Sequence, residues 1–244
     1  MDIKIKFDAE HNAQCPTFVL CTRNGTKIGA IPAHDINYAA HMNSADELLF
    51  VVDKFDNDKQ CDIWNSIQNF KLVYVNEWNK FFESTVEINE SNQQIKTITC
   101  VSLGDSEASN VKLYGLEVNT ETDIAREDYV KTILYDPDHT SGSLLHRVMQ
   151  KMPLYQFKHI DSSIASIQRT FSFDDVYVYD ALQEIAEEIN CIFLLEVELD
   201  SDGNMVRSIS AYDLESYCLD CGKRGDFLES CPDCGSTNIQ LGYG

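Results

Sequence analysis

Four cysteines near the C-terminus form two C-x2-C pairs, and their spacing constrains the fold more than any other feature of the sequence. Cys218 pairs with Cys221 and Cys231 pairs with Cys234, with nine residues between the pairs and a glycine after each second cysteine. A tight turn of this kind directs two thiolates at one metal ion, and tetrahedral zinc takes four such ligands about 2.3 Å away. The following glycine permits the positive φ that the turn needs. The sequence therefore predicts a zinc ribbon over residues 214–244.

The expected Zn2+ is structural, with one ion per chain, because four thiolates fill a tetrahedral shell and leave no open position for a substrate. In a short segment with few apolar residues, the ion is expected to supply much of the local folding free energy. Two other interpretations are four independent thiols and a redox C-x-x-C pair. The spacer is too short to bury four separate thiols, and a redox pair needs a helix start rather than a hairpin.

The other five of the nine cysteines are isolated along the chain, a pattern that does not indicate a disulfide framework. We expect them to be small apolar residues of the core. They are Cys15, Cys21, Cys61, Cys100 and Cys191.

The charge of the chain excludes one class of function. Its 40 acidic and 19 basic residues give a formal net charge of −21, which disfavours a general affinity for nucleic acid or anionic membranes. Residues 116–213 carry −12 of this charge. No apolar run reaches the roughly 18 residues that cross a bilayer. We therefore expect a protein made in the cytoplasm, with no membrane anchor and no stable nucleic-acid binding.

Residues 1–115 show mostly period-two alternation, which predicts a β-rich domain built as a small barrel or sandwich. Asn24-Gly25 is a strong hairpin signal, and Pro32 is expected to stop the strand that follows it. One helical turn is expected to bury Ile63, Trp64 and Ile67, and residues 89–92 suggest a turn. The candidate strands are residues 3–7, 18–21, 27–31, 48–52, 71–75, 80–88 and 94–103.

Residues 116–213 predict an α+β domain with two helices. The first is capped by Thr140 or Ser141, carries Leu144, Leu145, Val148, Met149 and Met152, and is ended by Pro153. The second starts at Asp180, with Gln183 as its capping-box partner. Its apolar positions are Leu182, Ile185, Ala186 and Ile189, and Glu184, Glu187 and Glu188 face outward. Strands are expected at residues 191–197 and 207–212, around a turn at 201–204.

The sequence offers no convergent catalytic group, so we expect neither catalytic nor cofactor-binding residues. The six histidines show no paired spacing and are interpreted as isolated side chains; they are His11, His34, His41, His139, His146 and His159. Residues 136–139 resemble a metal or acid-base cluster but are better explained as a loop before a helix. The acidic pairs at 174–175 and 187–188 are interpreted as solvated faces. Trp64 and Trp78 are better explained by core packing than by a sugar-binding platform.

Three stretches of strand and turn sequence, together with the ribbon, resemble tail-hub proteins from long-tailed phages of Gram-positive hosts. The stretches are residues 18–31 (FVLCTRNGTKIGAI), 113–120 (LYGLEVNT) and 168–173 (QRTFSF). The ending from residue 212 through both cysteine pairs is similar to a zinc-ribbon insertion of that group.

The resemblance implies a tail-tip or baseplate-hub component, similar to the N-terminal part of tail-associated lysins, located at the virion tail tip and assembled in the host cytoplasm. Such proteins form trimeric rings of β-barrel and α+β domains at the end of the tail tube. Implied partners are a distal tail protein and a tape-measure protein, with DNA only passing through. Lytic activity belongs to C-terminal extensions in that family, and these 244 residues stop after the ribbon. They represent either a truncated form or a stand-alone hub.

The expected domains are therefore a hub domain at 1–115, an α+β domain at 116–213 and the ribbon at 214–244. Two alternatives to a structural role are a tail-associated peptidoglycan hydrolase and a cellular zinc-ribbon adaptor. The hydrolase would need a catalytic group that the sequence does not show. The adaptor would need a basic ribbon, whereas residues 214–244 contain only two basic residues, Lys223 and Arg224, and five acidic ones.

Overall fold

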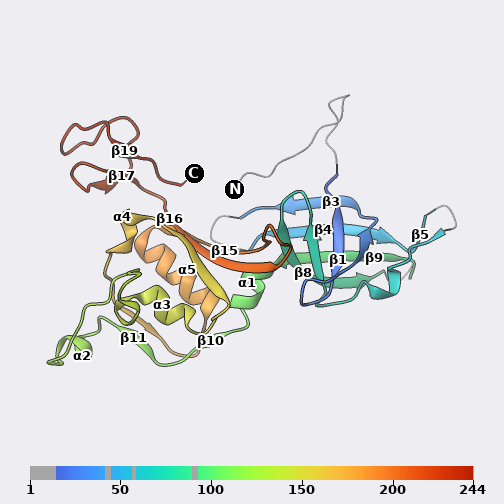
Figure 1. The fold of residues 1–244 in the computed structure, drawn as a ribbon, viewed down its shortest axis with the longest axis horizontal. Coiled ribbons are helices and arrows are strands. Elements are labelled where there is room, and N and C mark those ends of the chain that lie inside the picture. The colour runs from blue at the N-terminus through green and yellow to red at the C-terminus, as the bar shows by residue number, and fades with distance from the viewer. Residues whose placement is uncertain (1–14, 42–44, 57–58, 90–92, 244) are drawn as a thin grey trace. The chain divides into compact units, whose positions relative to one another are not determined.

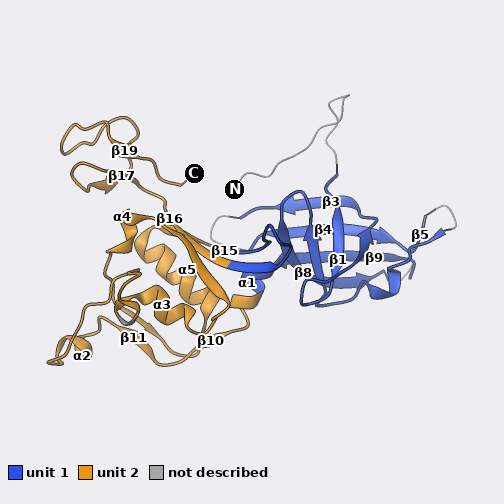
Figure 2. Ribbon diagram, viewed as in Figure 1, with its two compact units in different colours: residues 1–106, 196–207 blue, residues 107–195, 208–244 orange. Residues whose placement is uncertain are grey.

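The computed structural model describes residues 15–41, 45–56, 59–89 and 93–243. The strand expected at residues 3–7, His11 and most of the turn expected at 89–92 lie outside the described residues. The chain forms two compact units, shown in Figure 2. Unit 1 comprises the chain up to residue 106 together with residues 196–207, and unit 2 comprises residues 107–195 and 208–244. The expected division after residues 115 and 213 stays a prediction.

The core of unit 1 is a seven-stranded antiparallel sheet with the order β2-β1-β7-β8-β9-β4-β3 (Figure 1). Its strands are β1 (Phe18–Cys21), β2 (Lys27–Ile31), β3 (His34–Ala39), β4 (Glu47–Asp53), β7 (Leu72–Val75), β8 (Lys80–Ile88) and β9 (Ile95–Ser102). A two-stranded ladder, β5 (Phe55–Asp56) with β6 (Lys59–Gln60), follows β4. The expected β-rich domain is confirmed.

The sheet curls around its own core, because side chains from strands far apart in its order meet. Phe18 on β1 stacks on Phe50 of β4 with ring centroids 5.1 Å apart, although β7, β8 and β9 separate these strands in the sheet. Tyr38 on the edge strand β3 packs 4.7 Å from Trp78 and 6.3 Å from Phe82 of β8. One buried apolar cluster joins these strands, as the barrel or sandwich prediction requires.

The expected hairpin at Asn24-Gly25 is confirmed. The backbone N–H of Thr22 donates to Thr26 O at 2.9 Å, and Gly25 takes a φ of +82° that a larger residue would adopt only with strain. The helical turn is also confirmed as η1 (Trp64–Ser66), with Trp64 and Ile67 buried, whereas Ile63 is only partly buried.

Besides the short β5–β6 ladder, strand β3 and helix α1 were not predicted. Pro32 ends β2, as expected, but Asp35 adopts a φ of +50° and the chain continues directly as β3. Helix α1 (Leu103–Ala108) begins at the last residue of the strand expected over 94–103. A sharp reversal within three residues gives no periodic signal, which explains why β3 was missed.

Unit 2 packs two helices, α3 (Leu144–Met149) and α5 (Val178–Ile189), with a three-stranded sheet of order β12-β16-β15. Its strands are β12 (Tyr155–Ile160), β15 (Cys191–Leu199) and β16 (Met205–Asp213). Residues 196–199 of β15 and 205–207 of β16 belong to unit 1. Short ladders join β10 (Lys112–Leu113) to β14 (Val176–Tyr177) and β11 (Leu116–Val118) to β13 (Phe171–Phe173). Short helices α2 (Glu121–Ile124) and α4 (Ser162–Ala165) complete the unit. The α+β prediction is confirmed.

The apolar stripe of α5 is confirmed, with Leu182, Ile185, Ala186 and Ile189 buried and Glu184, Glu187 and Glu188 exposed. The expected start at Asp180 with a Gln183 capping box is wrong. The helix begins at Val178, whose backbone N–H donates to Val111 O at 2.8 Å. A main-chain carbonyl from another segment therefore satisfies the first N–H in place of a side-chain cap.

The cap expected for α3 at Thr140 or Ser141 is also wrong, because residues 140–142 form a separate 3-10 turn and Ser143 holds the cap position. The Ser143 hydroxyl donates to Leu134 O, and the first helical N–H groups donate to Ile133 O and Leu134 O. The helix ends at Met149, before the Met152 that was expected. No helix in the described residues is long and apolar enough to span a membrane.

Candidate metal centre

The four cysteines of the two C-x2-C pairs come together in the ribbon. Their sulfur atoms all lie within 4.8 Å of one another. The Sγ atoms of Cys218 and Cys234 are 3.6 Å apart, and those of Cys221 and Cys231 are 3.5 Å apart. Cys218 and Cys231 are buried, whereas Cys221 and Cys234 are exposed. The cluster can bind a metal ion.

Two glycine turns bring the sulfur atoms together. Gly222 and Gly235 adopt φ values of +78° and +72°, as the sequence predicted. The N–H of Gly222 donates to Cys218 O at 2.9 Å, and the N–H of Gly235 donates to Cys231 O at 2.8 Å. Strand β17 (Ser216–Cys218) carries the first ligand and pairs with β18 (Arg224–Gly225) and β19 (Ile239–Gln240). The ribbon backbone thus defines the position of each pair.

The sulfur separations fit a tetrahedral thiolate site. Four thiolates about 2.3 Å from one ion stand about 3.8 Å from each other, close to the 3.6 Å between Cys218 and Cys234 and the 3.5 Å between Cys221 and Cys231. Disulfide sulfurs would be about 2.05 Å apart. Burial raises the pKa of the Cys231 thiol, but hydrogen bonds from the backbone N–H groups of Cys234 and Asp233 and from the thiols of Cys221 and Cys234 together outweigh burial, so its pKa falls to about 7. Such N–H groups stabilise the thiolate form that a metal binds.

Arg224, between the two cysteine pairs, connects the ribbon to the rest of unit 2. Its guanidinium donates to both carboxylate oxygens of Asp213, which is only 2% exposed, and to the C-terminal carbonyl of α5 at Ile189. Asp213 also accepts a hydrogen bond from the Ser163 hydroxyl at 2.6 Å, and its N–H donates to Asp161 at 2.8 Å. The buried carboxylate is therefore fully paired.

A second connection runs through β19 and the residues after it. Gln240 donates to Asp161 at 3.1 Å, and the Tyr243 N–H donates to Asp213 O at 2.7 Å. The Tyr243 ring stacks on Tyr212 at 4.7 Å, and Tyr212 stacks on His159 at 4.9 Å. Together with Arg224, these contacts attach the ribbon to the α4 and β16 region of unit 2.

The five single cysteines differ in burial. Cys21, Cys100 and Cys191 are buried as expected, and Cys61 is partly buried. Burial raises the pKa of Cys21 to about 11 and that of Cys191 to about 12, so both are protonated in the core. The core prediction is wrong for Cys15, which is exposed because it precedes the first described strand.

The described histidines do not assemble into a site. Among the described residues, the four ribbon cysteines are the only group of three or more His, Cys, Asp or Glu side chains that could hold a metal ion. His34 lies between Asp35 and Asp53, and His159 pairs with Asp161. His146 packs against the Tyr135 and Phe157 rings, which also contact each other, and His41 follows β3.

The acidic motifs also take the structural roles expected of them. The Asp136 carboxylate accepts the backbone N–H groups of Asp138 and His139, which supports the loop interpretation of residues 136–139. Asp174 and Asp175 are exposed, and Asp175 pairs with Lys112. These carboxylates define loops instead of meeting in one centre.

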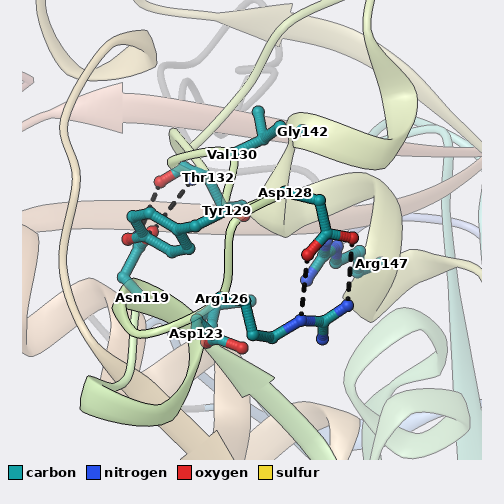
Figure 3. A pocket seen from close by; sticks show the side chains of 10 residues that line it. Asn119, Asp123, Arg126, Asp128, Tyr129, Val130, Thr132, Gly142 and Arg147 are labelled. Carbon is teal, nitrogen blue, oxygen red and sulfur yellow. Dashed lines mark hydrogen bonds and ion pairs between the residues drawn. The ribbon is translucent and has the colours of Figure 1, made fainter.

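A pocket that the sequence did not reveal lies beside α2 (Figure 3). It has a volume of about 260 Å3 and contains Arg126, Arg147, Asp123 and Asp128. One wall is held by Asn119, whose side chain bonds to Tyr129, to both backbone groups of Thr132 and to Arg169 O. Equal numbers of cationic and anionic side chains leave the pocket without a clear preference for one charge. The only sequence signal was the capping box of Thr120 and Asp123.

No protein-family model and no curated protein matches this chain. Among solved structures, it is similar to the prophage tail protein gp18 of Listeria monocytogenes EGD-e, with 11% identity and a TM-score of 0.47 over 81% of this chain and 50% of that one. It is also similar to a chain of the Francisella PdpA-VgrG complex, with 11% identity and a TM-score of 0.37 over 80% of this chain and 30% of that one. The chain thus spans half or less of the length of these proteins.

Proposed function

We propose that this chain is a structural component of a phage tail tip or baseplate hub, which forms an oligomeric ring at the end of the tail tube. The observation that carries the proposal is the pairing of two segments far apart in the sequence that both resemble tail-hub proteins. Residues 113–120 contain β11 and residues 168–173 contain β13, and these strands pair from Leu116↔Phe173 to Val118↔Phe171. The third such segment, residues 18–31, forms the β1–β2 hairpin.

We further propose that Cys218, Cys221, Cys231 and Cys234 hold one structural Zn2+ per chain. The donor set is four sulfurs at separations that suit a tetrahedral ion. When bound, zinc would cross-link the two glycine turns, in addition to the hydrogen bonds from Ser236 and Asn238 to Asp220. The rigid ribbon would then present Arg224 to Asp213 and so keep its attachment to unit 2.

The proposed assembly is a closed homotrimer whose partners are other tail proteins, namely a distal tail protein and a tape-measure protein, at the tip of the virion. A head-to-tail interface gives a closed ring when the rotation between neighbouring copies closes on itself. The exposed carboxylates of Glu184, Glu187 and Glu188 belong to the most acidic part of the chain. If they line a channel, they repel passing DNA, and salt screens this effect beyond about 8 Å.

Light scattering over a hundredfold range of concentration, combined with negative-stain images, tests the assembly. A trimer has a mass of about 83 kDa, three times the 27.7 kDa of one chain, and should appear as a ring. A monomer at every concentration, with no ring in the images, would argue against the proposal.

A zymogram on bacterial cell walls tests the hydrolase alternative, because clearing by the purified chain would show a lytic activity that the proposal excludes.

A further inference from the structure

A wide groove on unit 1 differs in chemistry from the rest of this acidic chain. It has a volume of about 910 Å3 and is bordered by five amide side chains, those of Asn65, Gln68, Asn69, Asn89 and Gln93. Two lysines, Lys54 and Lys96, complete its polar lining, and no carboxylate lines it among the described residues. In a chain with 40 acidic and 19 basic residues, a lining whose described residues are rich in amides and include no acidic group suggests a polar, hydroxyl-rich ligand.

The floor of the groove is fixed by a buried ammonium group. Lys96 is 6% exposed, and its Nζ donates to Trp64 O at 2.7 Å and to Ile67 O at 2.6 Å. The same Nζ lies 4.5 Å from the centroid of the Trp64 ring, which is buried, as the packing interpretation predicted. These contacts hold the η1 turn, so the backbone that carries Asn65 and Gln68 is preorganised.

The neighbouring wall is held by β8. The Asn69 carboxamide accepts the Val86 N–H at 2.6 Å, and the Ser84 hydroxyl donates to Gln68 O at 3.2 Å. Next to Asn69, Phe70 has a φ of +62° and is 66% exposed, although its N–H donates to Ser84 O at 2.8 Å. A bulky residue in this region of φ is strained, and such strain concentrates at ligand sites.

Several polar groups of the groove are available to a ligand. Asn65 and Gln93 are exposed, and neither side chain has a hydrogen-bond partner within the described part of the chain. The Lys54 ammonium lies 5.5 Å from the centroid of the Phe55 ring and has no ion pair with any described carboxylate. Each amide offers donors and an acceptor, as pairs of sugar hydroxyls require, and Lys54 adds one positive charge.

We propose that this groove binds a carbohydrate chain and that Lys54 favours chains carrying acidic groups. Ile88, which lines the groove and is 54% exposed, supplies an apolar surface for the C–H side of a sugar ring. Nucleic acid is a poorer fit, because a groove with only one available lysine on a protein of charge −21 attracts phosphates weakly. This site does not depend on the proposed ring.

An array of immobilised bacterial polysaccharides, acidic and neutral, with single-stranded DNA as an additional spot, tests the proposal on the intact protein. We expect binding to acidic polysaccharides above neutral ones and above DNA. Lys54→Gln should lower affinity several-fold for acidic polysaccharides only. The double variant Asn65→Ala with Gln93→Ala should lower affinity about tenfold for both classes.

Asn65 and Gln93 are exposed, and Lys54 is half-buried but forms no ion pair with a described carboxylate. Changes at such positions have little effect on folding, so a melting curve should show both variants folded. Gln168→Ala, an exposed amide change in unit 2, is the matched control and should bind as the unaltered protein does. The proposal is overturned if no polysaccharide is bound, if DNA is bound in preference, or if the double variant binds as tightly as the control.

Discussion

Arg224 and Asp213 form a bidentate ion pair, in which Arg224 Nη2 lies 2.7 Å from Asp213 Oδ1 and Arg224 Nε lies 2.8 Å from Asp213 Oδ2. Asp213 is 2% exposed, and Arg224 lies in the segment between the two cysteine pairs. A buried carboxylate in the body of unit 2 is thus neutralised by a side chain of the ribbon. This pair links the candidate metal centre to the fold that carries it.

Arg224→Ala should destabilise unit 2, because it leaves the Asp213 carboxylate buried without its counter-ion. Breaking one partner of a buried pair costs about 3 to 5 kcal/mol, which urea unfolding would measure. Arg126→Ala is the control, since the Arg126–Asp128 pair is exposed and such pairs contribute about 0 to 1 kcal/mol. An equal decrease in the free energy of unfolding in the two variants would show that the buried Arg224–Asp213 pair stabilises the protein no more than an exposed pair does.

Removal of the metal should loosen the ribbon while leaving the unit 1 sheet intact. The amides of Gly222 and Gly235 donate within the cysteine turns and should lose hydrogen-exchange protection when a chelator is added. The amides of β8, held between β7 and β9, serve as the internal control and should be unchanged. Identical protection of the two glycine amides with and without chelator would contradict a metal-dependent ribbon.

Asp105 should make stability fall as pH rises. Burial raises the pKa of its carboxyl to about 6, although the hydrogen bond from Ser102 opposes this. An unfolded aspartate has a pKa of about 3.9. Between about pH 4 and pH 6 the native state therefore holds a proton that the unfolded chain has released, so the free energy of unfolding decreases through that window.

Asp105→Asn removes this pH dependence because the amide does not titrate. The unfolding free energy of the variant minus that of the unaltered protein should grow between about pH 4 and pH 7, by up to about 3 kcal/mol. Urea unfolding at a series of pH values gives this difference directly. A constant difference across the range would show that Asp105 does not titrate with a raised pKa.

Asn119→Gly should destabilise the loop beside α2. The change keeps the residue compatible with its φ of +55° but removes an amide that bonds to Tyr129, Thr132 and Arg169. Thr132 is buried, so its backbone groups would lose partners, at a cost of about 2 to 3 kcal/mol. Thermal melting compared with the surface variant Gln168→Ala measures the effect. Similar melting of the two variants would contradict this role of Asn119.

The features that were predictable from sequence are those in which local residues determine local structure. Asn24-Gly25 specifies its hairpin, the spacing of Leu182 to Ile189 specifies the buried side of α5, and each C-x2-C-G specifies its turn. The position of Gly222 and Gly235 at positive φ follows from the same local logic.

The features that were missed depend on partners far away in the sequence. The start of α5 is determined by Val111 O, and that of α3 by the carbonyls of residues 133 and 134. No local pattern reveals that Arg224 reaches Asp213, or that Asn119 joins residues 129, 132 and 169. These contacts arise only when the chain is packed, and they determine the attachment of the ribbon and the shape of the pocket.

The most direct test of a ring-forming, zinc-bearing tail component is native mass spectrometry of the purified chain. The expected result is a species with the mass of three chains and three zinc ions, which loses its metal when acidified. A chain mass that carries no metal, together with a monomer at every concentration, would contradict the proposed zinc-bearing ring.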